Sequence, residues 1–316
     1  MTRDVATEFV ARVRRAKLRS RVDAATAEVV RELRADGVRP LLLKGPAIAS
    51  LLYEADSQRI YWDTDLLVGP SEYAAAEHCL ARIGFREMLA DSDVPGLVVA
   101  GHAWRRAGGV PAVDLHWTFA GAGAAPSEVW DSLSESTRVL RVAGVDVEAP
   151  SVAACALIVA LHAAHHGLAV AHPLEDLARA LDLLDQETWA AAARLAERLG
   201  ATDAFTSGVT LHPTGRRLAA DMSLPTRLSR ELVLMRGSPP PGAVTLEVLV
   251  STEGALAKLR LVARKVVPSR RFVRAWFPRA TRGRRWLAAG YLWRPVWLLL
   301  RAWPAISARR RAGRTW

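Results

Sequence analysis

The spacing of hydrophobic residues in this chain changes at residue 151. Before it, short apolar runs bounded by glycine and proline predict strands, with helices between them. After it, hydrophobic residues recur only at helical spacing, and 51% of all residues are hydrophobic, which is ample for a packed core. We therefore expect an α+β protein. The predicted strands cover residues 38–43, 64–68, 85–89 and 110–119 and a hairpin of 138–142 with 145–148; the predicted helices cover residues 4–36, 46–52, 72–83, 151–166, 174–185, 188–199, 202–219 and 226–236.

These patterns divide the chain into three expected segments. Residues 1–150 hold the strands and the N-terminal helix, and residues 151–236 form a helical region. Three consecutive prolines between Gly237 and Gly242 predict a linker. Residues 237–316 are therefore expected to form this linker and a helical tail.

The tail has an unusual charge. From Gly254 to Trp316 there are 17 lysine and arginine residues and no acidic residue, whereas the whole chain carries a net charge of +11. The preceding residues therefore carry a net charge of −6. The same segment holds six of the eleven tryptophans. This asymmetry predicts a polyanionic partner for the tail, either a membrane surface or nucleic acid.

An apolar run from Trp286 to Trp303 favours the membrane. Arg294, Pro295 and Arg301 interrupt the run, which disfavours a membrane-spanning helix. Tryptophan beside arginine suits the membrane interface instead, and the run is too long for a groove that stacks bases. We predict an anionic membrane surface as the partner of residues 258–316, with nucleic acid less favoured. In a third interpretation, the tryptophans pack on the rest of the protein and the arginines are solvated.

The cysteines and the N-terminal residues indicate in which cell compartment the protein is expected. Cys79 and Cys155 lie far apart and match no metal-ligand spacing, so we interpret them as buried thiols of a reducing compartment. Met1 to Glu8 is polar and lacks the apolar core of a signal peptide. The predicted location is the cytoplasm, with peripheral attachment to the inner face of the cell membrane.

Two acidic residues open one of the predicted strands. Asp63 and Asp65 are separated by one residue, so their side chains project from the same strand face. Neighbouring carboxylates repel each other unless a divalent cation neutralises them, and two-metal phosphoryl-transfer sites use such pairs. Asp114, in the alternating strand around residues 110–119, is a candidate third ligand. An Asp-x-Asp pair in an exposed turn would be only solvated, but here it leads directly into the buried Leu66 to Val68 run.

Lys44-Gly45 precedes this pair and ends an earlier strand. A glycine before a helix lets backbone amides approach a phosphate, and the lysine supplies a point charge; alternatively, the lysine only extends to solvent at a strand end. Arg59 either binds a phosphate or pairs with an acidic neighbour. His116 shares the predicted strand face of Asp114, where it either contacts nucleotide or substrate or serves as a hydrogen-bonded structural residue.

These motifs, in this order, resemble the uncharacterised bacterial nucleotidyltransferase family of the DNA polymerase beta superfamily. The similarity covers roughly residues 20–235. The matching stretches are Leu42 to Ala47, Leu52-Tyr53, Arg59, Asp63 to Val68, Val113 to Trp117, Leu161-His162, His165-His166 and Glu175 to Leu177.

The resemblance implies a small mixed sheet flanked by helices, with residues 151–236 completing the active-site cleft. It also implies that Asp63, Asp65 and Asp114 bind two Mg²⁺ ions, and that Lys44 and Gly45 bind the phosphates of a nucleoside triphosphate, for which ATP is expected. In much of the superfamily the first turn carries Gly-Ser. Here it is Lys44-Gly45-Pro46, as in this family, and the proline removes one amide donor.

Three histidines lie on the predicted helix 151–166. His162 and His166 have the spacing of a zinc pair, but Ala163 and Ala164 stand where a zinc protease carries its glutamate. That activity is therefore rejected. We predict that His165 and His166 line a substrate pocket and that Asp176 orients one of them; alternatively, Asp176 is an exposed residue of an amphipathic helix.

The leading functional hypothesis is a Mg²⁺-dependent nucleotidyltransferase. It would transfer a nucleoside monophosphate to an acceptor hydroxyl of a small molecule, sugar, peptide or protein, and release pyrophosphate. A second hypothesis is a catalytically reduced protein that binds nucleotide or docks at the membrane, although three retained acids argue against it. The third is a kinase-like transfer of the γ-phosphoryl group on the same scaffold.

Overall fold

The computed structural model describes residues 2–54, 59–88, 100–107, 111–237 and 239–313. The chain divides into two compact units, which are described separately below. The first unit comprises Met1–Met88, Ala100–Val159 and Glu175–Ala201; the second comprises Leu89–Val99, Ala160–Leu174 and Thr202–Trp316. These units group residues by contact, so the three-segment division at residues 150 and 236 stays a prediction.

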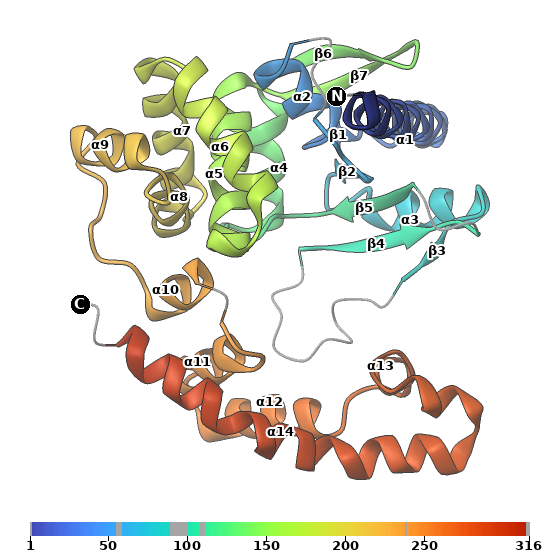
Figure 1. The fold of residues 1–316 in the computed structure, drawn as a ribbon, viewed down its shortest axis with the longest axis vertical. Coiled ribbons are helices and arrows are strands. Elements are labelled where there is room, and N and C mark those ends of the chain that lie inside the picture. Colours follow the sequence, from blue (N-terminus) through green and yellow to red (C-terminus); the bar gives the residue numbers. More distant parts are fainter. Residues whose placement is uncertain (1, 55–58, 89–99, 108–110, 238, 314–316) are drawn as a thin grey trace. The chain divides into compact units, whose positions relative to one another are not determined.

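A five-stranded mixed sheet forms the centre of the first unit (Figure 1). Only the β2–β5 pair is parallel among the described strands, and every other neighbouring pair is antiparallel. This pairing confirms the expected small mixed sheet of an α+β protein. The side chains of Leu66, Leu67, Val113 and Leu115 are fully buried in it. The strand order is β1 (Leu41–Leu42), β2 (Asp63–Leu67), β5 (Ala112–His116), β4 (Gly101–Arg105) and β3 (Arg86–Glu87).

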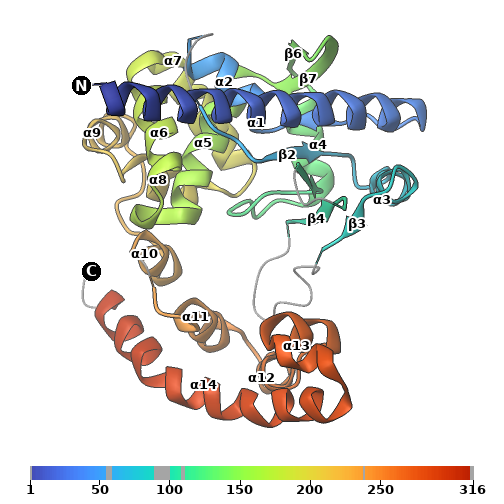
Figure 2. The same cartoon turned by 45° about the vertical axis from the view of Figure 1, so that its right-hand side comes forward.

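Helix α1 (Thr2–Ala35) contacts this sheet with one apolar face. Val22, Val29 and Leu33 are fully buried, and α1 contacts β2, α3 (Tyr73–Arg82) and the hairpin of β6 (Thr137–Val142) and β7 (Val145–Pro150) (Figure 2). The helix ends where the sequence predicts it, because Gly37 has a φ of 79° and the Val38 amide donates to the Leu33 carbonyl.

The hairpin and several other predicted elements are confirmed. The two hairpin strands are longer than predicted, whereas β1, β3 and β5 are shorter than the strands predicted for residues 38–43, 85–89 and 110–119. β1 has only two residues because Pro40 has no N–H and the Arg39 amide donates to Glu72 instead of a strand. Val110 and Leu89, at the ends of two predicted strands, lie outside the described residues. β4 was not predicted, although it pairs with both β3 and β5. The other helices with residues in this unit are α2 (Pro46–Leu52), α4 (Pro126–Ser134), which was also not predicted, α5 (Val152–His166), α6 (Ala171–Leu183) and α7 (Gln186–Arg198).

The second unit is helical in its described residues. The single helix predicted for residues 202–219 is wrong: it is two helices, because Pro213 cannot donate to the preceding turn and instead begins a new helix capped by His212. Its elements are the 3₁₀ turn η2 (Gly167–Ala169), α8 (Thr202–Val209), α9 (Pro213–Asp221), α10 (Arg230–Arg236), α11 (Ala243–Ser251), α12 (Ala255–Val266), α13 (Arg270–Trp276), the 3₁₀ turn η3 (Pro278–Arg282) and α14 (Arg284–Ala312), together with the ends of α5 and α6.

One window among the described helices is long and apolar enough to cross a membrane. It covers Val152–Ala169, and 61% of it is buried in the protein. A core helix meets the same criterion, since it also needs an apolar surface on most sides. Among the described residues, α14 provides no such window.

Candidate active site

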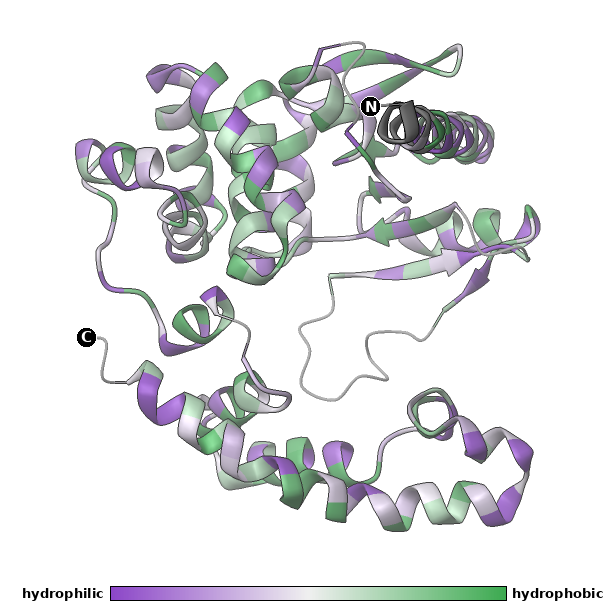
Figure 3. Ribbon diagram, in the orientation of Figure 1, coloured by the Kyte–Doolittle hydropathy of each residue, from purple (hydrophilic) through white to green (hydrophobic). Residues whose placement is uncertain are grey.

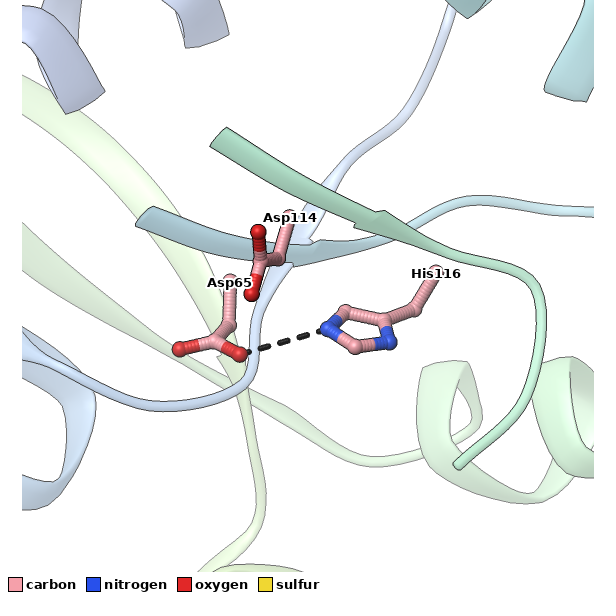
Figure 4. A group of neighbouring side chains, drawn as sticks. All are labelled: Asp65, Asp114 and His116. Atoms are coloured by element: carbon pink, nitrogen blue, oxygen red, sulfur yellow. Dashed lines mark hydrogen bonds and ion pairs between the residues drawn. The ribbon is translucent and has the colours of Figure 1, made fainter. Parts of the chain in front are cut away.

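The two acidic motifs meet because β2 and β5 are parallel neighbours. Their register places Asp65 opposite Asp114 and Leu67 opposite His116. Side chains alternate along a strand, so Asp65, Asp114 and His116 project from the same face of the sheet (Figure 4). Each of the three offers one potential ligand atom, and these atoms all lie within 4.8 Å of one another. The sequence predicted that Asp65 and Asp114 are close, and the strand register shows how.

Lys44 partly neutralises this cluster. Its Nζ lies 2.5 Å from Oδ1 of Asp65, which is 3% exposed. Burial raises the pKa of the Asp65 carboxyl, but Lys44 and His116 outweigh it and hold the pKa well below its usual range. Burial likewise lowers the pKa of the Lys44 ammonium, but Asp65 outweighs it and the net shift is upward. Asp65 and Lys44 are therefore both charged at neutral pH.

At Asp63 and Asp114, burial outweighs the attraction of Lys44 and His116. Burial, followed by the charge of Asp65, raises the pKa of Asp114 to about 6. The same two causes raise the pKa of Asp63. Among the described residues, Lys44 thus interacts with all three carboxyl groups, and a cation would relieve the repulsion between them.

The residues present fit a divalent cation. Carboxylate oxygens are the ligands that Mg²⁺ prefers, and Asp65 and Asp114 supply them from adjacent strands. His116 Nε2 lies 3.2 Å from Asp65 Oδ1, so its N–H can orient that carboxylate, as hydrogen-bonded neighbours of metal ligands do. Within the described part of the chain, His116 Nδ1 is a buried nitrogen without a hydrogen-bond partner. Asp63 lies outside this cluster of three, and its role as a ligand stays a prediction.

The turn after β1 holds Lys44 beside β2. The Leu43 amide donates to the Asp65 carbonyl at 2.9 Å, which aligns the end of β1 with the acidic strand. Gly45 then adopts a φ of 60°, which favours glycine, and Pro46 begins α2. Pro46 has no N–H, and the Ala47 amide donates to the Lys44 carbonyl. Contact of Lys44 and Gly45 with a phosphate stays a prediction.

Arg59 is a buried part of this structure. Its Nε and Nη2 donate to the two carboxylate oxygens of Asp176 at 2.9 and 2.6 Å, and its Nη1 donates to the Gly45 carbonyl at 3.1 Å. Tyr53 donates its hydroxyl to the same Asp176 carboxylate at 2.8 Å. Of the two alternatives for Arg59, the structure shows the acidic partner, and contact with nucleotide stays a prediction.

The contacts of Asp176 with Tyr53 and Arg59 were not predicted from the sequence, because Asp176 lies far from the other two residues along the chain. Asp176 is 2% exposed, so it is not the exposed residue of the alternative interpretation. The available signal was that Tyr53, Arg59 and Asp176 all stand in motifs shared with the family. Nothing in their spacing indicated that they meet.

The three histidines at the end of α5 belong to the second unit. The rings of His162 and His166 are 4.7 Å apart and those of His165 and His166 are 5.1 Å apart, each edge to face. His172 adds a fourth ring, 6.5 Å from His162. Histidines thus cluster at the end of α5, and a role for His165 and His166 in a substrate pocket stays a prediction.

Comparisons with known proteins identify the family. A sequence model of the family described as "Uncharacterised nucleotidyltransferase" matches residues 2–213. No curated protein is recognisably similar to the chain.

Solved structures with a related arrangement include two of the antibiotic-resistance factor ANT(2'')-Ia. Its solution structure has a TM-score of 0.40 and 16% identity over 57% of this chain and 95% of that one. Its crystal structure with adenylyl-2"-tobramycin has a TM-score of 0.42 and 15% identity over 56% of this chain and 97% of that one. An antigenic nucleotidyltransferase-like protein from Paracoccidioides brasiliensis has a TM-score of 0.36 and 16% identity, covering 57% and 93%.

These structural similarities are too low to support an argument about this chain. The family match does support an assignment, because it covers about two thirds of the sequence and includes Lys44, Asp65 and Asp114. The protein is a nucleotidyltransferase, and it belongs to the family of uncharacterised nucleotidyltransferases.

Proposed function

We propose that this nucleotidyltransferase transfers a nucleoside monophosphate from a nucleoside triphosphate, ATP being the expected one, to an acceptor hydroxyl. The observation that carries the proposal is the register of Asp65 against Asp114 on neighbouring parallel strands, with Lys44 against Asp65. A site that only needed to be stable would not bury mutually repelling carboxylates, since the repulsion costs free energy. The arrangement is useful when a divalent cation and a triphosphate enter it.

The carboxylates would hold two Mg²⁺ ions. Asp63, Asp65 and Asp114 are the residues that would hold them. When bound, the ions would neutralise charge on the triphosphate and on the attacking oxygen. His116 would orient Asp65, and Lys44 would supply a positive charge for a phosphate oxygen.

The acceptor hydroxyl must lose its proton during the transfer, and a protein side chain can take it up. The acceptor oxygen forms a bond to the α-phosphorus, the bond from the α-phosphorus to the bridging oxygen breaks, and pyrophosphate leaves. The hydroxyl proton is assigned to an Oδ atom of Asp114, the carboxyl group that faces Asp65 across the two parallel strands. Acceptors with a hydroxyl group include sugars, small metabolites, peptides and protein side chains.

The test is a mass-shift screen of candidate acceptors with Mg²⁺ and each nucleoside triphosphate, together with an assay for released pyrophosphate. Asp63→Asn with Asp65→Asn should abolish transfer while the protein stays folded. The matched control is Asp146→Asn, because Asp146 is an exposed acid paired with Arg141 on the hairpin. Full transfer by the double variant would refute the proposed site.

The released product distinguishes the alternatives. Pyrophosphate together with a nucleotidylated acceptor supports the proposal. A nucleoside diphosphate together with a phosphorylated acceptor would indicate γ-phosphoryl transfer instead. Mg²⁺-dependent nucleotide binding without turnover on any acceptor would indicate the binding-protein alternative.

A further inference from the structure

The last helix of the second unit, α14, has one buried face and one exposed apolar face. Its buried residues are Gly290, Arg294, Ala305, Ala308 and Ala312. Toward the C-terminus, the alanines pack with Leu234 of α10 and Ala243 of α11 in one apolar cluster. The small residues let these helices approach closely, so one side of α14 is fixed against its own unit.

Toward the N-terminus, the same side of α14 is fixed by an arginine among aromatic rings. The Arg294 guanidinium lies over the rings of Phe272, Trp276 and Trp297 at 4.9, 4.6 and 4.9 Å, and its Nε donates to the Lys265 carbonyl. Gly290 adds close packing, since a Cβ there would lie 2.8 Å from Val273. Part of the tail's aromatic content therefore packs within the tail.

The opposite side of α14 carries large apolar residues that this packing leaves exposed. Leu292, Leu299 and Trp303 are 77%, 75% and 69% exposed. Spacings of three, four and seven residues place the whole set on one side of a helix, within about a third of its circumference. We call this set the apolar stripe of α14; it comprises Leu292, Trp293, Val296, Leu299, Leu300 and Trp303.

Basic residues lie at both ends of the apolar stripe. Arg285 lies seven residues before Leu292 and Arg310 lies seven after Trp303, so both extend the same side of the helix. Figure 3 shows hydrophilic and hydrophobic residues alternating along α14. On α12, Leu256 and Leu259 are also exposed, at 61% and 64%, among lysine and arginine.

We propose that the apolar stripe of α14 inserts into the headgroup region of an anionic membrane, while the surrounding arginines bind lipid phosphates. Tryptophan and leucine beside arginine are the composition of a helix that lies in the interface. The complete absence of acidic residues after Glu253 matches a surface of negative charge. The inference goes beyond the proposed transfer reaction and does not depend on it.

Other occupants of the stripe fit less well. A second copy of the chain would bring another strongly basic tail against the first, and like charges repel. Nucleic acid would neutralise the arginines but would leave Leu292, Leu299 and Leu300 in water, because bases stack on aromatic rings rather than on leucine. An anionic bilayer meets both requirements.

The test uses the full-length protein and sedimentation with lipid vesicles. One set of vesicles contains phosphatidylcholine with about 30% phosphatidylglycerol, and the other contains phosphatidylcholine alone. The variant Leu292→Asp with Leu299→Asp changes two exposed residues of the stripe. The control, Val139→Asp with Leu183→Asp, makes the same change in charge at residues that are 65% and 61% exposed in the first unit.

The unmodified protein and the control should bind the anionic vesicles, and the stripe variant should bind at least about tenfold more weakly. Binding should weaken toward about 1 M salt and should be slight on phosphatidylcholine alone. Equal binding by the stripe variant would overturn the proposal. The proposal would also be overturned if the unmodified protein did not bind the anionic vesicles but bound a single-stranded oligonucleotide. Dimers of the unmodified protein that are absent in the stripe variant would overturn it as well.

Discussion

Replacing Asp114 with asparagine should stabilise the metal-free protein at neutral pH, although it should abolish nucleotidyl transfer. Asparagine has nearly the same shape as aspartate but no charge. It therefore removes the repulsion from Asp65 and the penalty for burying an ionised carboxylate, which together raise the pKa of Asp114 to about 6. Most core substitutions destabilise a protein, so stabilisation by this one would be diagnostic.

The magnitude follows from the pKa. The ordinary value for aspartate is 3.8, so the folded protein holds this proton more tightly by about two pKa units. Each unit corresponds to about 1.4 kcal/mol, which makes the cost of ionising Asp114 in the folded state at most about 3 kcal/mol. Because the group is partly exposed and its neighbours can relax, we expect a gain of about 1–3 kcal/mol in the free energy of unfolding.

The pH dependence has a definite sign. A carboxyl group whose pKa is higher in the folded than in the unfolded protein binds more protons when folded. Its contribution to the free energy of unfolding is therefore full below about pH 4, falls as the pH rises to about 6, and is absent above that. The advantage of Asp114→Asn should thus be present at pH 8 and absent at pH 4.

The assay is denaturant unfolding in the presence of a chelator at these two pH values, with Asp146→Asn as a control. Asp146 is 61% exposed, so its substitution should leave the pH dependence unchanged. Mg²⁺ should stabilise the unmodified protein more than the Asp114 variant. A variant as stable as the unmodified protein at pH 8, or less stable, would refute the assignment of Asp114 to a repelling acidic cluster.

Three further predictions concern single contacts. Asp176→Asn should cost about 3–5 kcal/mol in denaturant unfolding, because it leaves the buried Arg59 guanidinium without its counter-charge; a loss below about 1 kcal/mol would contradict this. Lys44→Gln should lower kcat/KM for the nucleoside triphosphate by at least about 100-fold while the circular dichroism spectrum stays unchanged, and near-normal kinetics would exclude Lys44 from phosphate binding. Gly208→Ala should destabilise the second unit by more than about 2 kcal/mol in thermal unfolding, because a Cβ at that position would overlap the backbone of Ala160; an unchanged melting temperature would show that the helices can separate.

The ends of several helices and strands could be predicted from short stretches of sequence. Gly37 ends α1 where a C-cap glycine predicts it, and Asp63 opens a strand because a buried apolar run follows it. The break at Pro213 was also readable, since a proline cannot donate to the turn before it, although we predicted one helix across it. Spacing within a window determines the direction of side chains, and local chemistry determines where an element ends.

Contacts between distant segments depended on the tertiary structure. β4 carries little hydrophobic alternation, and it is a strand only because β3 and β5 provide partners on both sides. Arg59 and Asp176 are 117 residues apart, and Arg59 also donates to the Gly45 carbonyl, which connects this pair to the turn after Lys44. In the tail, Trp297 packs on Arg294 while Trp303 is 69% exposed, and composition alone does not distinguish these two tryptophans.

The acidic cluster combines both kinds of information. The alternation of a strand places Asp65 and Asp114 each on a definite face, and the sequence shows this. Their meeting requires β2 and β5 to be parallel neighbours in one register, and a shift by one residue would turn Asp114 to the other face. That register follows from burying Leu66 and Val113 together with α1, and this burial is a property of the whole folded core that no single stretch of the sequence contains.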